Sequence, residues 1–274
     1  MNENKSRLKY IIISAVAIIA AVAVMLLLIP IERERELAEE YGVLYENSKT
    51  DEKSAYIFEH IDEIPEDILW YYYSDYDRYV DFVCGYPEHK NDYENMSFTE
   101  EELNSETVPA LYMNDFRWGY EKIGGAYVFS SGCMAVSITM ANLALRHNGD
   151  IDPVKVFEAA VEMDGFGTFG GIDNEIVPQL LENLGFEYVI HDYSPDSEES
   201  GEADINAVIN ALENGSVVMA GTHGETFGSH ALIIRSVDEN GTMLINDPAN
   251  PKKTDAVWDF YELQPEIYFI WELS

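Results

Sequence analysis

Cys133, His230 and Asp247 have the residue types and the order that nucleophilic catalysis by a thiol requires. Ser131-Gly132-Cys133 precedes a run of helical spacing, so Cys133 is expected at a helix start. Free N–H groups and the positive end of the helix dipole stabilise a thiolate there, and Gly132 lets the chain turn sharply. An imidazole can take the thiol proton while a carboxylate fixes its orientation. These residues therefore predict a thiol nucleophile served by a His-Asp pair.

The register of one predicted hairpin places the base beside the acid. Two apolar runs are joined by the turn sequence at 238–241. If these four residues form the loop, Val237 faces Thr242, and Asp247 becomes a diagonal neighbour of His230 on the same sheet face, within ~7–8 Å. A slip of one residue would put the two side chains on opposite faces, so the prediction depends on the turn.

Other residues compete for these roles. His223 lies in the Gly-rich segment that leads to His230, and it is the rival candidate for the base. The remaining histidines are predicted to lack a paired acid in a comparable strand context: His60, His89, His147 and His191. Cys84 lies in an upstream helical segment with no matching histidine, which favours a packed structural residue. The alternative is a Cys84–Cys133 disulfide, which would silence the site.

Hydrophobic periodicity predicts the elements that position these residues. One helix is expected from Cys133 to about His147, and the next begins at Pro153 with Asp152 as its cap. Further helices are expected around 174–184 and 204–213, with two short ones inside 56–87, the second ending at Gly85. Strands are expected over 187–193, 216–221, 230–237, 242–247 and 266–273. Helices first and an antiparallel sheet afterwards predict an α+β domain.

The N-terminus predicts a membrane anchor. The run 11–29 is apolar except for Ser14, close to the ~20 residues that a helix needs to cross a bilayer. A cleaved signal peptide is the alternative because Ala21-Val22-Ala23 offers small residues, but the apolar run continues beyond them. Basic residues are in slight excess before the run, which predicts a cytoplasmic stub over 1–10. We expect a helical stalk and linker over 30–107 and an extracellular domain over 108–274.

Composition limits the partners. The chain has 16 Lys and Arg against 51 Asp and Glu, a formal net charge of −35, which repels phosphate backbones. Nucleic acid is therefore not an expected partner. Because the acidic residues are spread along the chain, we interpret them as keeping an exposed domain soluble rather than as a binding face.

Taken together, these motifs resemble a known family. Residues 111–145, which contain Asp-Phe-Arg-Trp and Ser-Gly-Cys, look like the catalytic-helix region of C39-like peptidases, bacterial members of the papain-like superfamily. Residues 230–251 look like their His and Asp region, and residues 257–271 like the end of the domain. The segment 64–87 is similar to a helical segment that often precedes this domain in Gram-positive proteins.

The resemblance implies a papain-like fold with Cys133 as nucleophile, His230 as general base and Asp247 as the orienting acid. The family usually carries Gln where this chain has Met113, and the amide of that Gln helps to form the oxyanion hole. Asn114 is the neighbouring residue that could supply an amide instead. Losing one such donor typically costs ~10²–10³ in turnover. Gly is also usual after the nucleophile, where this chain has Met134.

These observations lead to one main hypothesis and two alternatives. The first is a membrane-tethered thiol hydrolase, a cysteine peptidase acting on peptide or amide bonds without metal or organic cofactor. It would contact the lipid bilayer through residues 11–29, and its substrate would be a peptide or protein. The second is a pseudoenzyme that keeps the fold to bind a peptide or surface partner, a hypothesis that rests on Met113. The third is a cell-wall amidase or acyltransferase that uses the same site.

Overall fold

The computed structural model describes residues 32–167, 171–195, 197 and 201–274. Contacts divide the chain into two compact units, one ending at Pro87 and one running from Glu88 to Ser274. The expected membrane span at 11–29 lies outside the described residues. In the described ranges, every helix is too short or too polar to cross a membrane.

The first unit contains helices that share a buried core. Asp51 caps one of them by accepting a hydrogen bond from the Ser54 N–H. Apolar side chains such as Ile57, Ile68 and Phe82 are fully covered, which an extended stalk would not provide. The helices are α2 (Gly42–Ser48), α3 (Glu52–Glu59), α4 (Glu66–Ser74) and α5 (Tyr76–His89), with a 3₁₀ turn at Ile61–Glu63.

Two expectations for this region were wrong. The helix predicted to stop at Gly85 continues to His89 with Pro87 inside it. Proline has a helical φ, but it loses the hydrogen bond to the carbonyl four residues earlier and its ring crowds that carbonyl, and the helix ends two residues after it. The expected linker also contains structure: a 3₁₀ turn at Asp92–Asn95 and α6 (Glu100–Leu103).

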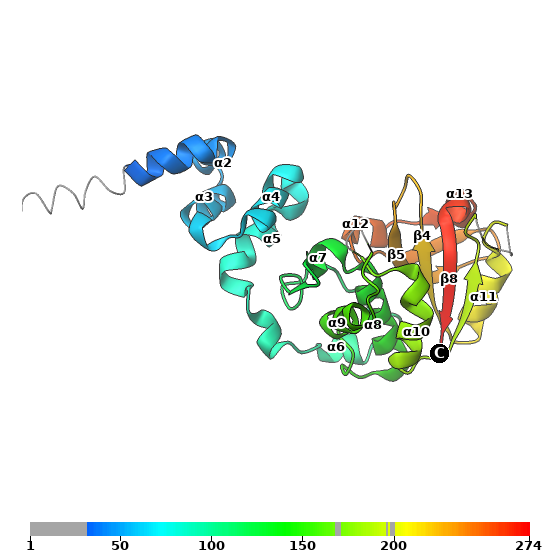
Figure 1. The fold of residues 1–274 in the computed structure, drawn as a ribbon. Helices are drawn as coiled ribbons and strands as arrows, with labels where there is room; N and C mark the ends of the chain where they lie inside the picture. Colours follow the sequence, from blue (N-terminus) through cyan, green and yellow to red (C-terminus); the bar gives the residue numbers. More distant parts are fainter. Residues whose placement is uncertain (1–31, 168–170, 196, 198–200) are drawn as a thin grey trace, which may run out of the picture. The chain divides into compact units, whose positions relative to one another are not determined.

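The second unit is built on an antiparallel sheet of six strands in the order β3-β8-β4-β5-β6-β7. Its central strands β8, β4 and β5 lie side by side in Figure 1. All five predicted strands are present. The sixth, β7, has two residues, too short for a periodic pattern to reveal. The strands are β3 (Tyr188–Asp192), β4 (Val217–Thr222), β5 (His230–Val237), β6 (Thr242–Asn246), β7 (Trp258–Asp259) and β8 (Ile267–Leu273). A small hairpin pairs β1 (Lys122–Ile123) with β2 (Ala126–Tyr127).

Helices cover both faces of this sheet. Alternate residues of the central strands, such as Met219 and Val218, belong to two different cores. One core joins the sheet to α8 (Cys133–Arg146), α9 (Pro153–Glu162) and α10 (Val177–Asn183). The other joins it to α11 (Ile205–Glu213) and α13 (Phe260–Leu263). The expected α+β class is confirmed.

The hairpin β5–β6 differs from its predicted register near the turn. Val237 pairs with Met243 instead of Thr242, so five residues, 238–242, separate the last paired residues instead of the predicted four. Inside this turn the Asp238 N–H donates to the Thr242 carbonyl, and Gly241 takes a left-handed conformation with φ 86°. A bulge at Arg235 then shifts the register back, so Ile233 pairs with Asn246. The expected register is therefore restored where the hairpin reaches the candidate site.

Candidate active site

Cys133 lies at the first position of α8, as predicted. The short helix α7 (Val128–Ser131) ends immediately before it, and Gly132 is the single residue between the two helices. Gly132 has an ordinary φ of −87°, so the sharp-turn reason for a glycine was wrong. A Cβ there would lie 2.5 Å from the Val128 carbonyl oxygen. Glycine is therefore required for space, and it lets α7 pack against the start of α8.

His230 and Asp247 meet beside this helix start. The imidazole Nε2 lies 2.8 Å from Oδ1 of Asp247, and the two side chains are 9% and 2% exposed. The carboxylate is fixed from the backbone, since its Oδ1 accepts the Ala249 N–H at 2.7 Å. The Asp247 N–H donates to the hydroxyl of Thr254 at 2.9 Å. Because Nε2 is engaged with Asp247, Nδ1 is left to interact with the thiol.

The charges of the three groups are coupled. Burial raises the pKa of the Cys133 thiol, but the hydrogen bond and charge of His230 outweigh burial and hold the pKa below its usual range. Backbone N–H groups of Ala231 and Met134 add to this stabilisation of the thiolate. Burial also opposes the imidazolium, yet the bonds to Asp247 and Cys133 raise the pKa of His230 to about 9. Burial disfavours the Asp247 carboxylate, but its bond to His230 keeps its pKa low.

This arrangement favours a thiolate–imidazolium pair at neutral pH. A thiolate formed in this way is a nucleophile before any substrate arrives, and the imidazolium beside it can protonate a leaving group. The backbone donors at Ala231 and Met134 were not predicted, because any residue supplies an N–H and the residue types there give no signal.

The rival residues do not join this site. The centroids of the His223 and Tyr268 rings lie 5.5 Å apart. The backbone N–H of His223 donates to the Glu266 carbonyl. The claim that other histidines lack an acid in a strand context was wrong, since His191 Nε2 lies 2.8 Å from Glu272 across β3 and β8. Within the described part of the chain, no hydrogen bond or ion pair joins this His191–Glu272 pair to a cysteine.

The disulfide alternative does not apply to this structure. Cys84 lies on α5 in the first unit, and Cys133 lies in the second. No disulfide joins the two described cysteines. The thiol of Cys133 is therefore available to His230.

The predicted oxyanion region presents a thioether instead of an amide. Met113 is 6% exposed and belongs to the core that includes α8. Its backbone N–H donates to the Pro248 carbonyl at 2.8 Å. Met113 therefore offers an oxyanion neither a side-chain donor nor its own N–H, while Asn114 beside it is half-buried.

The segment that carries Met113 is fastened to the hairpin that carries Asp247. The Asn246 side-chain amide donates to the carbonyls of Val108 and Pro109 at 2.9 and 3.2 Å. Asn246 is buried at the end of β6, next to Asp247. Sequence reasoning missed this residue, because an asparagine at a strand end reads equally well as a turn residue.

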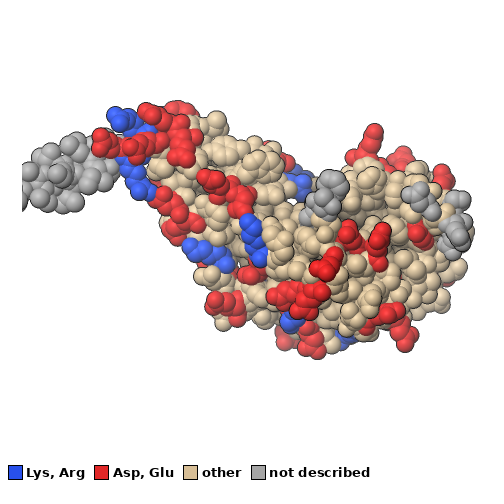
Figure 2. Space-filling model, in the orientation of Figure 1, with Lys and Arg blue, Asp and Glu red and all other residues tan. Residues whose placement is uncertain are grey.

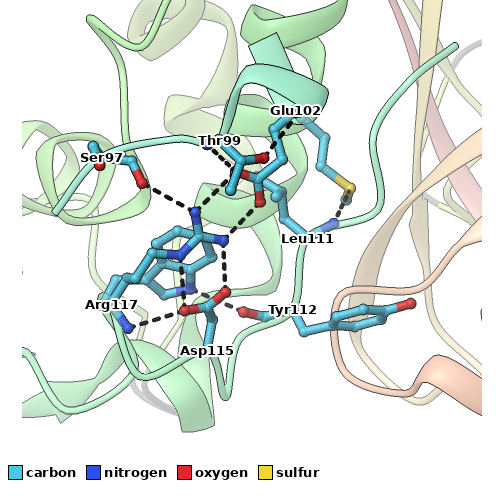
Figure 3. A network of polar contacts seen from close by, with 9 residues as sticks. Ser97, Thr99, Glu102, Leu111, Tyr112, Asp115 and Arg117 are labelled. Atoms are coloured by element: carbon cyan, nitrogen blue, oxygen red, sulfur yellow. Dashed lines mark hydrogen bonds and ion pairs between the residues drawn. The ribbon is translucent and has the colours of Figure 1, made fainter. Parts of the chain in front are cut away.

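A polar network holds the loop from Tyr112 to Trp118 (Figure 3). The Arg117 guanidinium donates to Asp115 at 2.7 and 3.0 Å and to Glu102 at 2.7 and 2.9 Å, forming two bidentate pairs. The Trp118 indole N–H closes the loop by donating to the Tyr112 carbonyl at 2.9 Å. The Asp-Phe-Arg-Trp motif thus positions the backbone on both sides of Met113 and Asn114.

The acidic side chains of the described residues do not gather around one site on the face that Figure 2 draws. On the face drawn in Figure 2 they are scattered over both units, with basic side chains among them. This distribution agrees with the interpretation that acidity keeps the surface soluble, and it marks no single acidic binding face there.

The second unit is similar to known proteins. The model of the Peptidase_C39 like family matches residues 106–271, more than half of the chain. A search of curated proteins found no match. Among solved structures, the chain is similar to the peptidase domain of Streptococcus ComA, described as a bi-functional ABC transporter involved in a quorum-sensing pathway. The sequence identity is 14% and the TM-score 0.39, covering 53% of this chain and 92% of that one.

Proposed function

Because the chain belongs to the Peptidase_C39 like family, we propose that it is a membrane-tethered thiol hydrolase that cleaves peptide or amide bonds. The observation that carries the proposal is the coupled site, in which His230 stabilises the Cys133 thiolate and is itself held 2.8 Å from Asp247. Peptides are the proposed substrate class, since the family is one of peptidases. Cys133 is the proposed nucleophile, His230 the acid and base, and Asp247 the orienting residue.

The proposed reaction runs through an acyl-enzyme. The Cys133 thiolate attacks the substrate carbonyl carbon, and the carbonyl π electrons move to oxygen to give an oxyanion. The imidazolium of His230 then gives its proton to the leaving amine as the C–N bond breaks, leaving a thioester. Neutral His230 takes a proton from water, the hydroxide equivalent attacks the thioester, and Cys133 leaves as a thiolate. The proton from water restores the imidazolium, and the departure of Cys133 restores the thiolate.

A second candidate is a catalytically weak module that binds peptides. The buried Met113 favours it, because a thioether donates no hydrogen bond to the oxyanion. The backbone N–H of Cys133 lies in the first turn of α8, where helix N–H groups lack partners within the helix. That donor alone supports a slower reaction than an amide and an N–H together.

Hydrolysis of a mixed peptide library by the full chain in detergent tests the proposal. We expect slow cleavage that is abolished by Cys133→Ala and unaffected by Cys84→Ala. If Cys133 is alkylated at low pH but no peptide is cleaved, and the library still binds, the binding module is the better description. Transfer of an acyl group to an added amine, without net hydrolysis, would indicate the acyltransferase alternative.

The membrane location is a separate part of the proposal. It rests on the apolar run 11–29 and on the excess of basic residues before it. Protease treatment of intact cells should remove nearly the whole chain, because everything after Pro30 would be outside. A soluble secreted product starting near Val24 would show instead that the run is a cleaved signal peptide.

A further inference from the structure

The connection between β4 and β5, residues 223–229, lies beside the His-Asp pair. Its Phe227 ring is almost parallel to the His230 imidazole, at 5°, with centroids 6.3 Å apart. Phe227 also contacts the Trp258 ring, at a centroid distance of 5.1 Å. Water competes for the hydrogen bond that His230 makes with Asp247, so an apolar ring beside the imidazole bears on the strength of that bond.

Two charged side chains hold this loop at Thr226. The Glu266 carboxylate accepts both the backbone N–H of Thr226, at 3.0 Å, and its hydroxyl, at 2.7 Å. On the carbonyl side, the Lys253 ammonium donates to the Thr226 oxygen at 2.7 Å. The same ammonium lies 4.2 Å from the centroid of the Phe227 ring, a cation–π contact. Lys253 therefore fastens both the backbone and the aromatic side chain of the loop.

Lys253 also acts on the site through its charge. It lies on the short helix α12 (Pro251–Thr254), directly after the Asp247 turn, and its charge helps to keep the pKa of that carboxylate low. The other titratable or charged groups around the pair come from several elements: Cys133 on α8, Tyr112 on the loop before it, Arg235 on β5 and Glu266 before β8.

We propose that Lys253 is a positioning residue that holds the 223–229 loop closed over the His230–Asp247 bond. The inference rests on the proposed function of that pair. With Lys253 in place, Phe227 stays beside the imidazole and the pair stays dry. Without it, the loop keeps the Glu266 contact but loses the tie at the Thr226 carbonyl. Water then reaches the pair, weakens the bond to Asp247 and makes the imidazolium less stable.

Lys253→Met keeps most of the side-chain length and removes the ammonium. The pH profile of Cys133 alkylation in the full chain then tests the inference. Iodoacetamide measures the acid limb, where the thiol ionises. Anionic iodoacetate measures the alkaline limb, where the imidazolium that attracts it is lost. A less stable imidazolium raises the pKa of the Cys133 thiol and lowers the pKa of His230, so the pH range of fast alkylation becomes narrower at both ends. We expect the rate at pH 6 to fall about three- to tenfold, as a rise of about half to one pKa unit requires, and the alkaline limb to move to lower pH.

Lys252→Met is the matched control, because Lys252 is an exposed neighbour on the same short helix. It should leave both limbs in place, and Lys253→Arg should restore most of the natural profile. Hydrogen exchange of residues 223–229 should rise in Lys253→Met only. This readout does not depend on the reactivity of Cys133, and unchanged exchange in the rest of the second unit confirms that the variant is folded.

Two results would overturn the inference. If both limbs move to higher pH together without faster exchange, Lys253 acts only as a distant charge, because removing a cation stabilises the imidazolium and destabilises the thiolate. If neither the limbs nor the exchange changes, the loop does not need Lys253. A natural protein whose Cys133 has the pH profile of an ordinary thiol would instead contradict the proposed function, while the exchange measurement still decides the role of Lys253.

Discussion

The two sides of the candidate site differ in how completely they are built. On one side, Cys133, His230 and Asp247 form a coupled set in which each group stabilises the charge of the next. On the other side, the loop that should hold the oxyanion is firmly fixed, but Met113 supplies no donor. Forming the nucleophile and stabilising the intermediate therefore depend on different segments, and a sequence change can weaken the second while the first stays intact.

The largest effect is expected from removing the base. The imidazolium that stabilises the Cys133 thiolate is present below about pH 9, the raised pKa of His230, and is lost as the pH rises through that value. The natural protein should therefore be alkylated readily at pH 6. In His230→Ala the thiol returns toward its ordinary pKa of ~8.5, so the rate at pH 6 should fall ~10²-fold.

Cys84 provides an internal reference for this measurement. It lies in the other compact unit, so its labelling rate should be the same in both proteins, and peptide mapping separates the two thiols. If His230→Ala is folded and Cys133 reacts as fast as before at pH 6, backbone donors and the helix dipole alone account for the thiolate.

The next effect tests the other side of the comparison. Met113→Gln restores a side-chain amide to the fixed loop, and it should raise peptide hydrolysis by as much as ~10²-fold if the rest of the site is in place. Alkylation of Cys133 should change little, since the ion pair is not altered. Turnover and alkylation measured on the same preparation would then show that the two sides act separately.

Met113→Leu is the matched control, because leucine has a similar volume and adds no donor. Met113 is buried, so a glutamine amide that finds no partner would cost about 1–3 kcal/mol of stability. Rapid hydrolysis by the natural protein that Met113→Gln leaves unchanged would mean that Asn114 or another donor already holds the oxyanion.

The side of the site that holds the nucleophile and the His-Asp pair was predicted better, because its residue types are those of catalytic groups. Cysteine, histidine and aspartate in this order are rare enough to notice, and the caps and periodicity of α8, α9 and α11 placed the helices within a few residues. The hairpin was predicted to bring His230 to Asp247, and it does so at 2.8 Å. The catalytic roles of these residues stay predictions.

The features that sequence reasoning missed depend on tertiary context. The one-residue shift at the turn around Gly241 and the bulge at Arg235 change the register in opposite directions, and neither leaves a signal in the alternation of residues. Asn246 and Lys253 make their contacts with segments far away or with backbone atoms. Backbone carbonyls are the same in every residue, so no motif marks them as partners.

The smallest effect on chemistry is expected from loosening the oxyanion loop without touching Met113. Arg117→Met leaves the carboxylates of Asp115 and Glu102, 27% and 17% exposed, without their shared cation. Unpaired and largely buried acids should cost about 1–3 kcal/mol, which for a unit of this size lowers the melting temperature by roughly 2–4 °C per kcal/mol. The less rigid loop should lower turnover up to ~10-fold, best measured in the Met113→Gln background.

Arg146→Met separates this positioning role from simple destabilisation. Arg146 is another partly buried arginine of the same unit, but it donates to the carbonyls of Leu184 and Gly185 and stacks on Phe186, at the far end of α8 from Cys133. Both variants should melt earlier, while only Arg117→Met should lower turnover, and Cys133 alkylation should stay within about twofold in both because the His-Asp pair is unchanged. Equal turnover in the two variants would mean that the Asp115–Arg117–Glu102 network stabilises the fold but does not position the loop. A parallel loss of alkylation in Arg117→Met would mean that the two sides of the site are not separate, since the loop would then help to hold the ion pair itself.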